Sequence, residues 1–214
     1  MQNIGPIVRR VLWFAAVQHA HQIRRLKPAE LRPYFKERHM DGLPYIVHLT
    51  GVAIDLALKR FDEVTICAAL LHDVLEDCPW IEEEAIERLF GQQIAQMVKA
   101  LSYVKSDGSI TAQREKYYGR LTSIEIVAIA LADVNDNSFS FLMSLTDPPD
   151  PDETEPPFER LKTTPQDELN HWRAVVEIAA KYEGDSRIRA LVEQVVPNIK
   201  AVQAKVDQGM VTVG

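Results

Sequence analysis

The densest group of ionisable side chains lies at residues 72–77, in the order His-Asp-Val-Leu-Glu-Asp, directly after an uncharged apolar run. Burying unpaired charge costs several kcal/mol, so a cluster in this place needs a partner. On a helix, Glu76 lies one turn after His72 and Asp77 one turn after Asp73, and all four side chains can meet near one point. A divalent cation there would turn the repulsion of the carboxylates into attraction. The segment therefore predicts a metal site.

The His72-Asp73 pair also has a simpler interpretation. A chain of this composition contains a His-Asp dipeptide by chance roughly 0.4 times, so the pair alone is a weak motif. A lone buried histidine is more often satisfied by hydrogen bonds than bound to a metal. Glu76 could likewise form only a salt bridge at a helix end. The metal interpretation therefore depends on further ligands elsewhere in the chain.

Two more candidate ligands end or begin apolar segments. His48 follows Pro-Tyr-Ile-Val at the start of a second predicted helix, and Asp133 ends the apolar run 124–132, where a lone acid needs a partner. Two imidazoles and two carboxylates form a mixed nitrogen and oxygen set that suits Mn²⁺, Fe²⁺ or Zn²⁺ better than Ca²⁺. Four protein ligands leave room for a water molecule, which can lose its proton near neutral pH and attack phosphorus.

Four ordered segments carry a family resemblance. They are His-x-x-Gln-x-Arg at 19–24, Gly-x-Pro-Tyr-Ile-x-His at 42–48, Ala-Ala-Leu-Leu-His-Asp-Val-Leu-Glu-Asp at 68–77, and Leu-Ala-Asp at 131–133 with Asn137 after it. In this order they resemble the HD-domain metal-dependent phosphohydrolases, and within them the (p)ppGpp hydrolase branch of the RelA/SpoT family, with its small alarmone hydrolases. The last third of the chain matches that family only as helices without site motifs.

The resemblance implies the metal site and its chemistry. The residues that it implies as Mn²⁺ ligands are His48, His72, Asp73 and Asp133. It implies that Glu76 and Asp77 orient and activate the attacking water. Two carboxylates so close together should titrate as a coupled pair, and one can take the proton of the water while the other positions it.

The resemblance also implies how the substrate is held. Arg24 would stack on or flank the guanine base, although the neighbouring Arg25 could serve equally, and an exposed arginine often has no such role. Asn137 would contact the nucleotide. His19 and Gln22 would support the site from the first helix.

The sequence departs from that family in three places. Ala130 and Val134 stand where the family usually has basic residues, which removes expected phosphate contacts. A basic insert at about 26–41 could replace the lost cations, since residues 24–38 hold six basic and two acidic side chains. An acidic, proline-rich loop is expected at about 144–157.

The elements that must position these residues are predicted to be helical nearly everywhere, which makes the fold class all-α. The resemblance implies that they form a single HD-type hydrolase domain over 1–214. The run 124–131 could be a strand by itself, but no comparable strand exists to pair with it, so a buried helix is predicted. A cap at Gly91 and a kink or shortening at Pro197 are expected. The other predicted helices are 4–20, 46–56, 64–71 with an end near Pro79, 81–90, 94–101, 166–182 and 185–206.

Composition limits the remaining possibilities. The 214 residues carry a net charge of −7, which argues against long nucleic acid as a partner. Cys67 and Cys78 cannot form a disulfide framework, and the apolar N-terminal stretch contains Arg9 and Arg10, so a soluble, cytoplasmic protein without a membrane span is predicted. The sequence does not indicate the oligomeric state.

These features together predict a function. The expected reaction is Mn²⁺-dependent release of pyrophosphate from the 3′ position of guanosine 3′,5′-bis(diphosphate), a small-molecule guanine nucleotide. One alternative is a phosphohydrolase for another nucleotide, such as the 2′-phosphate of NADPH or a nucleoside monophosphate. A second is a catalytically silent nucleotide-sensing module, which would have no physical need for an intact Glu76-Asp77 pair.

Overall fold

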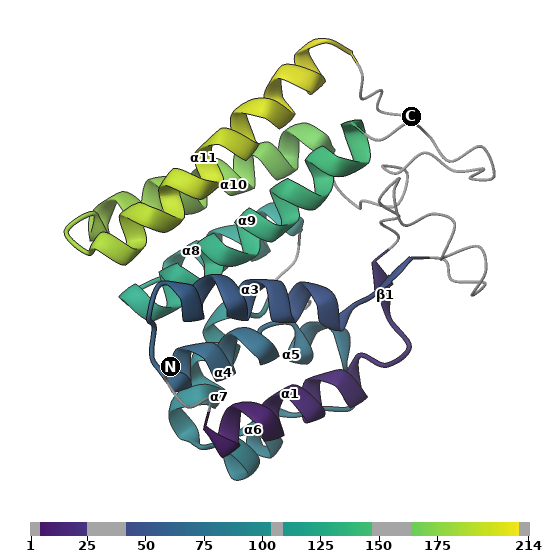
Figure 1. The fold of residues 1–214 in the computed structure, drawn as a ribbon, viewed down its shortest axis with the longest axis vertical. Helices are drawn as coiled ribbons and strands as arrows, with labels where there is room; N and C mark the ends of the chain where they lie inside the picture. The colour runs from purple at the N-terminus through teal and green to yellow at the C-terminus, as the bar shows by residue number, and fades with distance from the viewer. Residues whose placement is uncertain (1–4, 25–41, 104–108, 147–163, 210–214) are drawn as a thin grey trace.

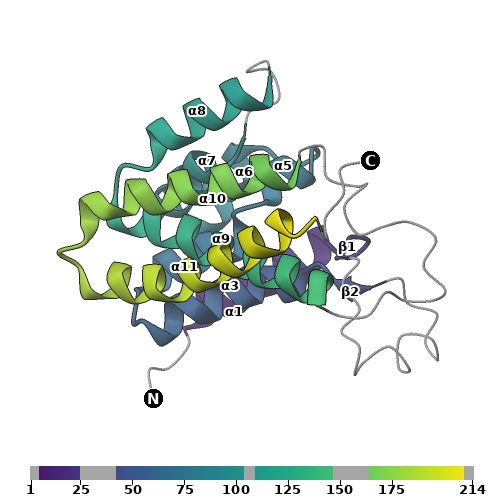
Figure 2. The same ribbon diagram turned by 90° about the horizontal axis from the view of Figure 1, so that it is seen from above.

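Helices from all parts of the chain pack around one long central helix in this computed structural model (Figures 1 and 2). The structure describes residues 5–24, 42–103, 109–146 and 164–209. The predicted all-α class is confirmed, with one short two-stranded ribbon among the described residues. In chain order the elements are α1 (Pro6–Gln18), β1 (Ile23–Arg24), β2 (Leu43–Pro44), α3 (Ile46–Leu58), α4 (Glu63–Leu71), α5 (Val74–Asp77), α6 (Glu83–Phe90), α7 (Gln92–Leu101), α8 (Ile110–Arg120), α9 (Ile124–Thr146), α10 (Pro165–Ala179), the 3₁₀ helix η3 (Ala180–Tyr182) and α11 (Ser186–Asp207).

Helix α9 is the central element. It packs against α3 and α4 on one side and against α10 and α11 on the other (Figure 1). Every residue from 127 to 132 is fully buried, because neighbours cover the helix all round. The predicted buried helix over 124–131 is therefore confirmed, and it continues to Thr146.

The same helix is the part of the described chain that is long and apolar enough to cross a membrane, from Ile124 to Met143. Nearly half of that window, 44%, is buried inside the protein, and it contains Asp133 and Asp136. Helix α9 is packed among other helices of the fold. Its high hydropathy is therefore that of a core helix.

The segment with the His-Asp pair forms two helices instead of one. Helix α4 begins at the side chain of Asp62, which accepts a hydrogen bond from the backbone N–H of Thr65, and it ends at Leu71. His72 and Asp73 form a turn before α5. The backbone N–H of Glu76 donates to the carbonyl of Asp73 at 3.1 Å, an i to i−3 contact that tightens this turn. The expectation of one continuous helix through this segment is wrong, although the burial predicted for 64–71 is largely observed.

The short ribbon brings the end of the first segment to the start of α3. Strands β1 and β2 are antiparallel, with Ile23 opposite Pro44 and Arg24 opposite Leu43. No sequence pattern predicted this pairing, because each strand has only two residues. The ribbon places Arg24 beside the helices that carry His48 and Asp133.

Two predictions about helix ends need correction. Helix α11 runs through Pro197 to Asp207, so the proline does not shorten it. Pro197 is exposed while Val195 and Ile199 are buried, and the lost backbone hydrogen bond therefore faces solvent. Gly91 does end α6 with a positive φ of 98°, but its ψ of 157° lies outside the left-handed helical region that was expected.

Several predicted features fall on residues that the structure does not describe. They are Arg25, the basic insert at 26–41 and the greater part of the acidic loop, from residue 147 to 157. Residues 144–146, predicted to begin that loop, are the last turn of α9. Cys67 and Cys78 are both buried free cysteines, and Cys67 lies in the apolar core as predicted.

Candidate metal and nucleotide site

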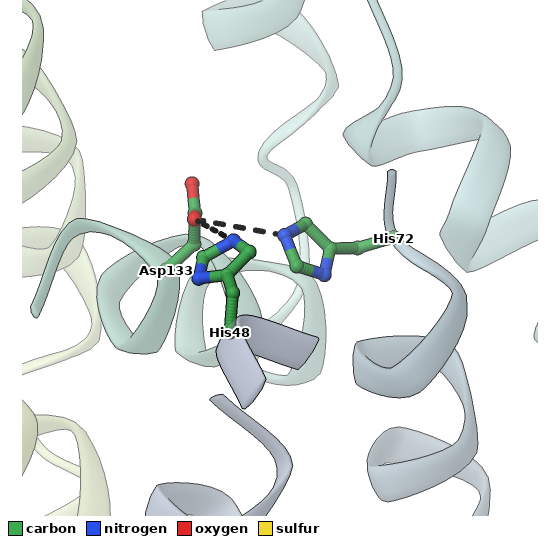
Figure 3. A group of neighbouring side chains, drawn as sticks. All are labelled: His48, His72 and Asp133. Carbon is green, nitrogen blue, oxygen red and sulfur yellow. Dashed lines mark ion pairs between the residues drawn. The ribbon is translucent and has the colours of Figure 1, made fainter. Parts of the chain in front are cut away.

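Three helical segments bring the four predicted metal ligands together. His48 is in the first turn of α3, His72 and Asp73 form the turn after α4, and Asp133 is in the middle of α9. The Nε2 atom of His48 lies 3.2 Å from Oδ1 of Asp133 and 3.4 Å from Oδ2 of Asp73. The Nε2 atom of His72 lies 3.6 Å and 3.2 Å from the same two oxygens (Figure 3 shows both histidines directed at Asp133).

The hydrogen bonds of the two imidazoles leave the same nitrogen directed at this cluster. The Nδ1–H of His72 donates to the carbonyl of Ala69 at 2.8 Å, and a carbonyl can only accept, so in the neutral ring Nε2 carries the lone pair. The Nδ1–H of His48 donates to Oδ2 of Asp136 at 2.8 Å. Histidines that bind metals are held in this way by an acceptor at the other ring nitrogen.

The donor set fits a divalent cation. One ligand atom each from His48, His72 and Asp133 lies within 4.8 Å of the others. The Nε2 atom of His72 is buried and has no hydrogen-bond partner of good geometry among the described residues, although it is within ion-pair distance of Asp73. A buried nitrogen of this kind, facing carboxylates, is what a metal ligand requires.

The charges in the cluster shift the pKa values of its members. Burial by itself lowers the pKa of His72, but the carboxylates of Asp73 and Asp133 outweigh it and raise that pKa to about 9. Burial raises the pKa of Asp133, but its contacts with the two histidines outweigh that effect and bring the pKa well below its ordinary value. The carboxylate oxygens of Asp73 and Asp133 favour protonated imidazoles. The same oxygens would bind a cation in place of those protons.

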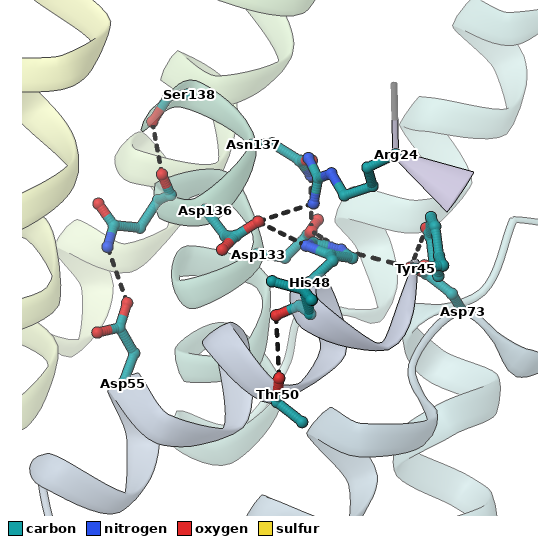
Figure 4. Close-up of polar contacts among 12 residues, drawn as sticks. Arg24, Tyr45, His48, Thr50, Asp55, Asp73, Asp133, Asp136, Asn137 and Ser138 are labelled. Carbon is teal, nitrogen blue, oxygen red and sulfur yellow. Dashed lines mark hydrogen bonds and ion pairs between the residues drawn. The ribbon is translucent and has the colours of Figure 1, made fainter. Parts of the chain in front are cut away.

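Asp136 is a residue of this site that the sequence did not reveal. It accepts hydrogen bonds at Oδ2 from Nδ1 of His48 and, at 2.7 Å, from Arg24 (Figure 4). Asp136 follows Asp133 by three residues, so helical periodicity places it on nearly the same face of α9. That spacing was the available signal, and the side chain holds the orientation of His48.

Two predicted substrate residues take part in the same network. Arg24 donates to Oδ2 of Asp136 and to Oδ1 of Asn137, both at 2.7 Å, and the amide of Asn137 donates to Oδ1 of Asp133 at 2.7 Å (Figure 4). Both residues therefore lie at the metal cluster. Their contacts within the protein fix the geometry of Asp133.

Tyr45 connects the N-terminal helix to the cluster. Its hydroxyl donates to Oδ2 of Asp73 at 2.7 Å, and its ring stacks on His19 with ring centroids 5.1 Å apart. His19 is hydrogen-bonded to Gln22, whose amide donates to the backbone carbonyl of Asp77 at 3.3 Å. His19 and Gln22 are thus placed as supports of the site.

The two predicted water-activating carboxylates occupy different places. Glu76 lines a cavity of about 310 Å³ beside the cluster and accepts a hydrogen bond at 2.6 Å from the backbone N–H of Tyr103. Burial and the charge of Asp73 raise its pKa to about 8. Asp77 is not among the described residues that line this cavity. Its charge nevertheless contributes to the raised pKa of Glu76.

The other side of the cavity comes from α8 and α10. We call this surface the α8–α10 wall and define it by five residues: Tyr103, Arg114, Tyr117, Glu168 and His171. Figure 2 shows α8 and α10 side by side at this edge of the fold. Sequence patterns predicted no helix over α8 and predicted 166–182 only as a helix without site residues, so this half of the cavity was missed.

A family model described as the HD domain matches residues 26–137, which is more than half of the chain. The chain belongs to the HD domain family. The matched segment contains all four metal-ligand candidates and both Glu76 and Asp77. It ends at Asn137, so Glu168 and His171 of the α8–α10 wall lie beyond it.

Curated relatives of this HD domain are much longer proteins. A guanosine-3′,5′-bis(diphosphate) 3′-pyrophosphohydrolase of Aquifex aeolicus is 33% identical over 124 residues, which cover 56% of this chain and 18% of the relative. The bifunctional (p)ppGpp synthase/hydrolase SpoT of Escherichia coli K12 is 33% identical over 126 residues, which cover 54% of this chain and 18% of the relative. The chain therefore spans about a fifth of the length of these relatives.

A solved structure supports the fold of this HD domain over its whole length. It belongs to a metazoan ortholog of SpoT that is described as hydrolysing ppGpp and playing a role in starvation responses. The two chains superpose with a TM-score of 0.62 at 21% identity, covering 97% of this chain and 98% of the other. The helices after the matched segment are thus part of the shared fold.

The two departures from the family pattern on α9 are buried in this HD domain. Ala130 is 0% exposed and Val134 is 1% exposed. Apolar side chains at these positions supply no cation to the cavity. Among the described residues that line it, Arg114 of α8 is the one lysine or arginine.

Proposed function

We propose that this HD domain hydrolyses guanosine 3′,5′-bis(diphosphate), (p)ppGpp, at the 3′ position. Water attacks the phosphorus bonded to the ribose 3′ oxygen, the bond between them breaks, and the products are GDP or GTP and pyrophosphate. The observation that carries this proposal is the convergence of His48, His72, Asp73 and Asp133 beside a cavity of about 310 Å³. The names of the matched relatives supply the substrate class.

The proposed cofactor is Mn²⁺. His48, His72, Asp73 and Asp133 would hold it through two imidazole nitrogens and two carboxylates, a set that suits Mn²⁺. When bound, a divalent cation acts as a Lewis acid and lowers the pKa of water toward neutrality. The Nδ1–H contacts of the two histidines leave Nε2 as the ligand atom of each ring, and a cation would bind there in place of a proton.

The carboxylates of α5 would handle the proton of the attacking water. Glu76 lines the cavity, and its carboxylate form would accept the proton of the water; burial and Asp73 raise its pKa to about 8, so that form predominates above this pH. Asp77 would act through its charge and position the water with Glu76. Arg24, Arg25 and Asn137 remain the proposed substrate contacts, with Arg24 and Asn137 already at the cluster.

The setting proposed for this reaction is the cytoplasm. The substrate would be a small guanine nucleotide, and the net charge of −7 disfavours long nucleic acid as a further partner. The proposed single domain is 1–214, with the insert at 26–41 and the acidic loop at 144–157 as its additions.

The proposal is tested with purified protein, Mn²⁺ and ppGpp. Release of pyrophosphate by the wild type is expected, and His72→Ala should abolish it because a buried ligand is lost. His21→Ala changes an exposed histidine and should leave the rate unchanged. No release with Mn²⁺, Fe²⁺, Zn²⁺ or Mg²⁺ would contradict the proposal, and protein that binds none of these metals would favour a silent nucleotide sensor.

A second nucleotide phosphate as substrate is favoured by one observation. Ala130 and Val134 are buried and apolar, so α9 presents no cation there for a second diphosphate. Assays with ppGpp, NADPH and nucleoside monophosphates as separate substrates decide between (p)ppGpp and another nucleotide. Inorganic phosphate from NADPH, with no pyrophosphate from ppGpp, would support the alternative.

A further inference from the structure

Arg114 is fixed against α10 in a way that leaves donors unused. Its Nη1 donates to the backbone carbonyl of Asp167 at 2.9 Å, and its Nη2 donates to Oε1 of Glu168 at 2.6 Å. A guanidinium has five N–H donors, so these two contacts leave three others. One of these is on Nε, which is buried and has no hydrogen-bond partner among the described residues. Because buried donors are normally satisfied, this nitrogen needs an acceptor, and Arg114 lines the cavity that a ligand would enter.

A hydrogen-bond chain next to Arg114 leaves a second donor for the cavity. The Nδ1 of His171 lies 2.9 Å from the hydroxyl of Tyr118, and its Nε2 lies 3.4 Å from the hydroxyl of Tyr103. Burial and the charge of Arg114 lower the pKa of His171 to about 4, so the ring is neutral and has one donor and one acceptor.

One of the two directions of this chain leaves a donor for the cavity. If Tyr118 donates to Nδ1, then Nε2–H donates to the oxygen of Tyr103, and the hydroxyl hydrogen of Tyr103 is left to donate elsewhere. Tyr103 lines the cavity, whereas Tyr118 is not among its described lining residues. Burial raises the pKa of Tyr103, so its hydroxyl keeps the proton.

We propose that Arg114 and Tyr103 form a phosphate-binding subsite in the α8–α10 wall, on a different side of the cavity from the metal cluster. Charge-assisted donors of a guanidinium together with a phenol hydroxyl suit a phosphate oxygen. The subsite supplies guanidinium N–H donors to the cavity, where Ala130 and Val134 supply none. This inference rests on the proposed function in one respect, that the phosphate belongs to the substrate nucleotide.

Two phosphate groups of that nucleotide could occupy the subsite. One is the 5′-diphosphate that stays on the product, and the other is the pyrophosphate that leaves. Calorimetric titration of the Mn²⁺-loaded protein with GDP, guanosine and inorganic pyrophosphate separates them, and it needs no turnover.

The expected result is a selective loss of phosphate affinity. Arg114→Gln should reduce the preference for GDP over guanosine by about tenfold or more if the subsite holds the 5′-diphosphate. It should weaken pyrophosphate binding by a similar factor if the subsite holds the leaving group. Tyr103→Phe should weaken the binding of the same ligand by a smaller factor, and it serves as a second, milder variant.

Two further variants separate phosphate binding from a role in holding α8 to α10. Glu168→Gln removes the same ion pair but keeps the guanidinium, so it should retain the phosphate preference that Arg114→Gln loses. Lys116→Gln removes one positive charge from the exposed side of α8 and should change nothing.

The proposal is overturned if Arg114→Gln and Tyr103→Phe both leave the GDP preference and pyrophosphate affinity within about threefold of wild type. It is also overturned if Glu168→Gln has the same effect as Arg114→Gln. If the wild type hydrolyses ppGpp in that case, the proposed function stands without this subsite. If Arg114 controls GDP binding in a protein that does not hydrolyse ppGpp, the subsite stands and the proposed function fails.

Discussion

The Oδ2 atom of Asp136 lies 2.8 Å from the Nδ1 atom of His48. This contact keeps the proton of the imidazole on Nδ1 and directs Nε2 at Asp73 and Asp133. Asp136 is not among the described residues that line the cavity. Its effect on the candidate metal site is therefore through the orientation of His48.

Asp136→Asn should therefore weaken the binding of Mn²⁺ by about 10–100-fold, the usual cost of losing the partner of a metal-binding histidine. Metal content after dialysis at several Mn²⁺ concentrations measures this loss. Asp55→Asn is the matched control, because Asp55 accepts a hydrogen bond from Asn135 between the same two helices, outside the cluster. Equal Mn²⁺ affinity in both variants would contradict the role assigned to Asp136.

A second prediction concerns the glycine that lets α3 approach Asp136. A Cβ atom on Gly51 would lie 2.6 Å from Oδ1 of Asp136, which is too close for a real contact. Gly51→Ala should push this carboxylate away from His48 and lower the Mn²⁺ affinity by about tenfold, while the helices stay folded. Gly119→Ala is the control, because a Cβ atom there meets nothing within 4 Å. Circular dichroism together with metal titration separates loss of the site from loss of the fold.

The third prediction concerns proton transfer by Glu76. Glu76→Gln removes the proton acceptor but keeps a side chain of nearly the same shape, so kcat for ppGpp should fall by about 10²–10⁴-fold. The bound Mn²⁺ should stay the same, since Glu76 is not one of the four proposed ligands. Glu84→Gln changes an exposed carboxylate on α6 and should have no effect. A Glu76→Gln variant with unchanged kcat would assign the proton transfer to another group.

The fourth prediction is a dependence of stability on pH through His171. Its neighbours from all packed elements are Tyr103 after α7, then Arg114, Tyr117 and Tyr118 on α8, Glu168 on its own helix, and Asp133 on α9. Burial and Arg114 lower its pKa to about 4 in the folded state, against 6.5 when unperturbed. Between these values the unfolded chain binds a proton that the folded chain does not, so the free energy of unfolding falls as pH drops from about 6.5 to 4.

Urea unfolding at several pH values measures that dependence. His171→Gln should flatten the plot of unfolding free energy against pH between pH 6.5 and 4. Each unit of difference between the folded and unfolded pKa of His171 contributes about 1.4 kcal/mol to the change over that range. His21→Gln changes an exposed histidine and should leave the curve as in the wild type. A curve for His171→Gln that coincides with the wild type would show that another group causes the dependence.

Local patterns in the sequence were sufficient for most of the helices and for the four ligand candidates, but not for α8. Apolar periodicity and the absence of a partner strand predicted the central helix α9, because those signals depend only on neighbours along the chain. His72 and Asp73 could be singled out because charges that follow an apolar run need a partner. The break between α4 and α5 was missed, since a tightened turn with helical dihedral angles leaves no mark in the periodicity.

Tertiary structure decided which side chains meet. Asp136, Arg114 and His171 lie on helices whose polar residues resemble ordinary solvated faces in the sequence. Only the packing of α3 against α9, and of α8 against α10, brings them to the cluster and the cavity. The sequence by itself determined the residue types of the ligand candidates and the apolar segments beside them, because both are local. The second wall of the cavity depended on contacts between distant segments, and local patterns do not contain that information.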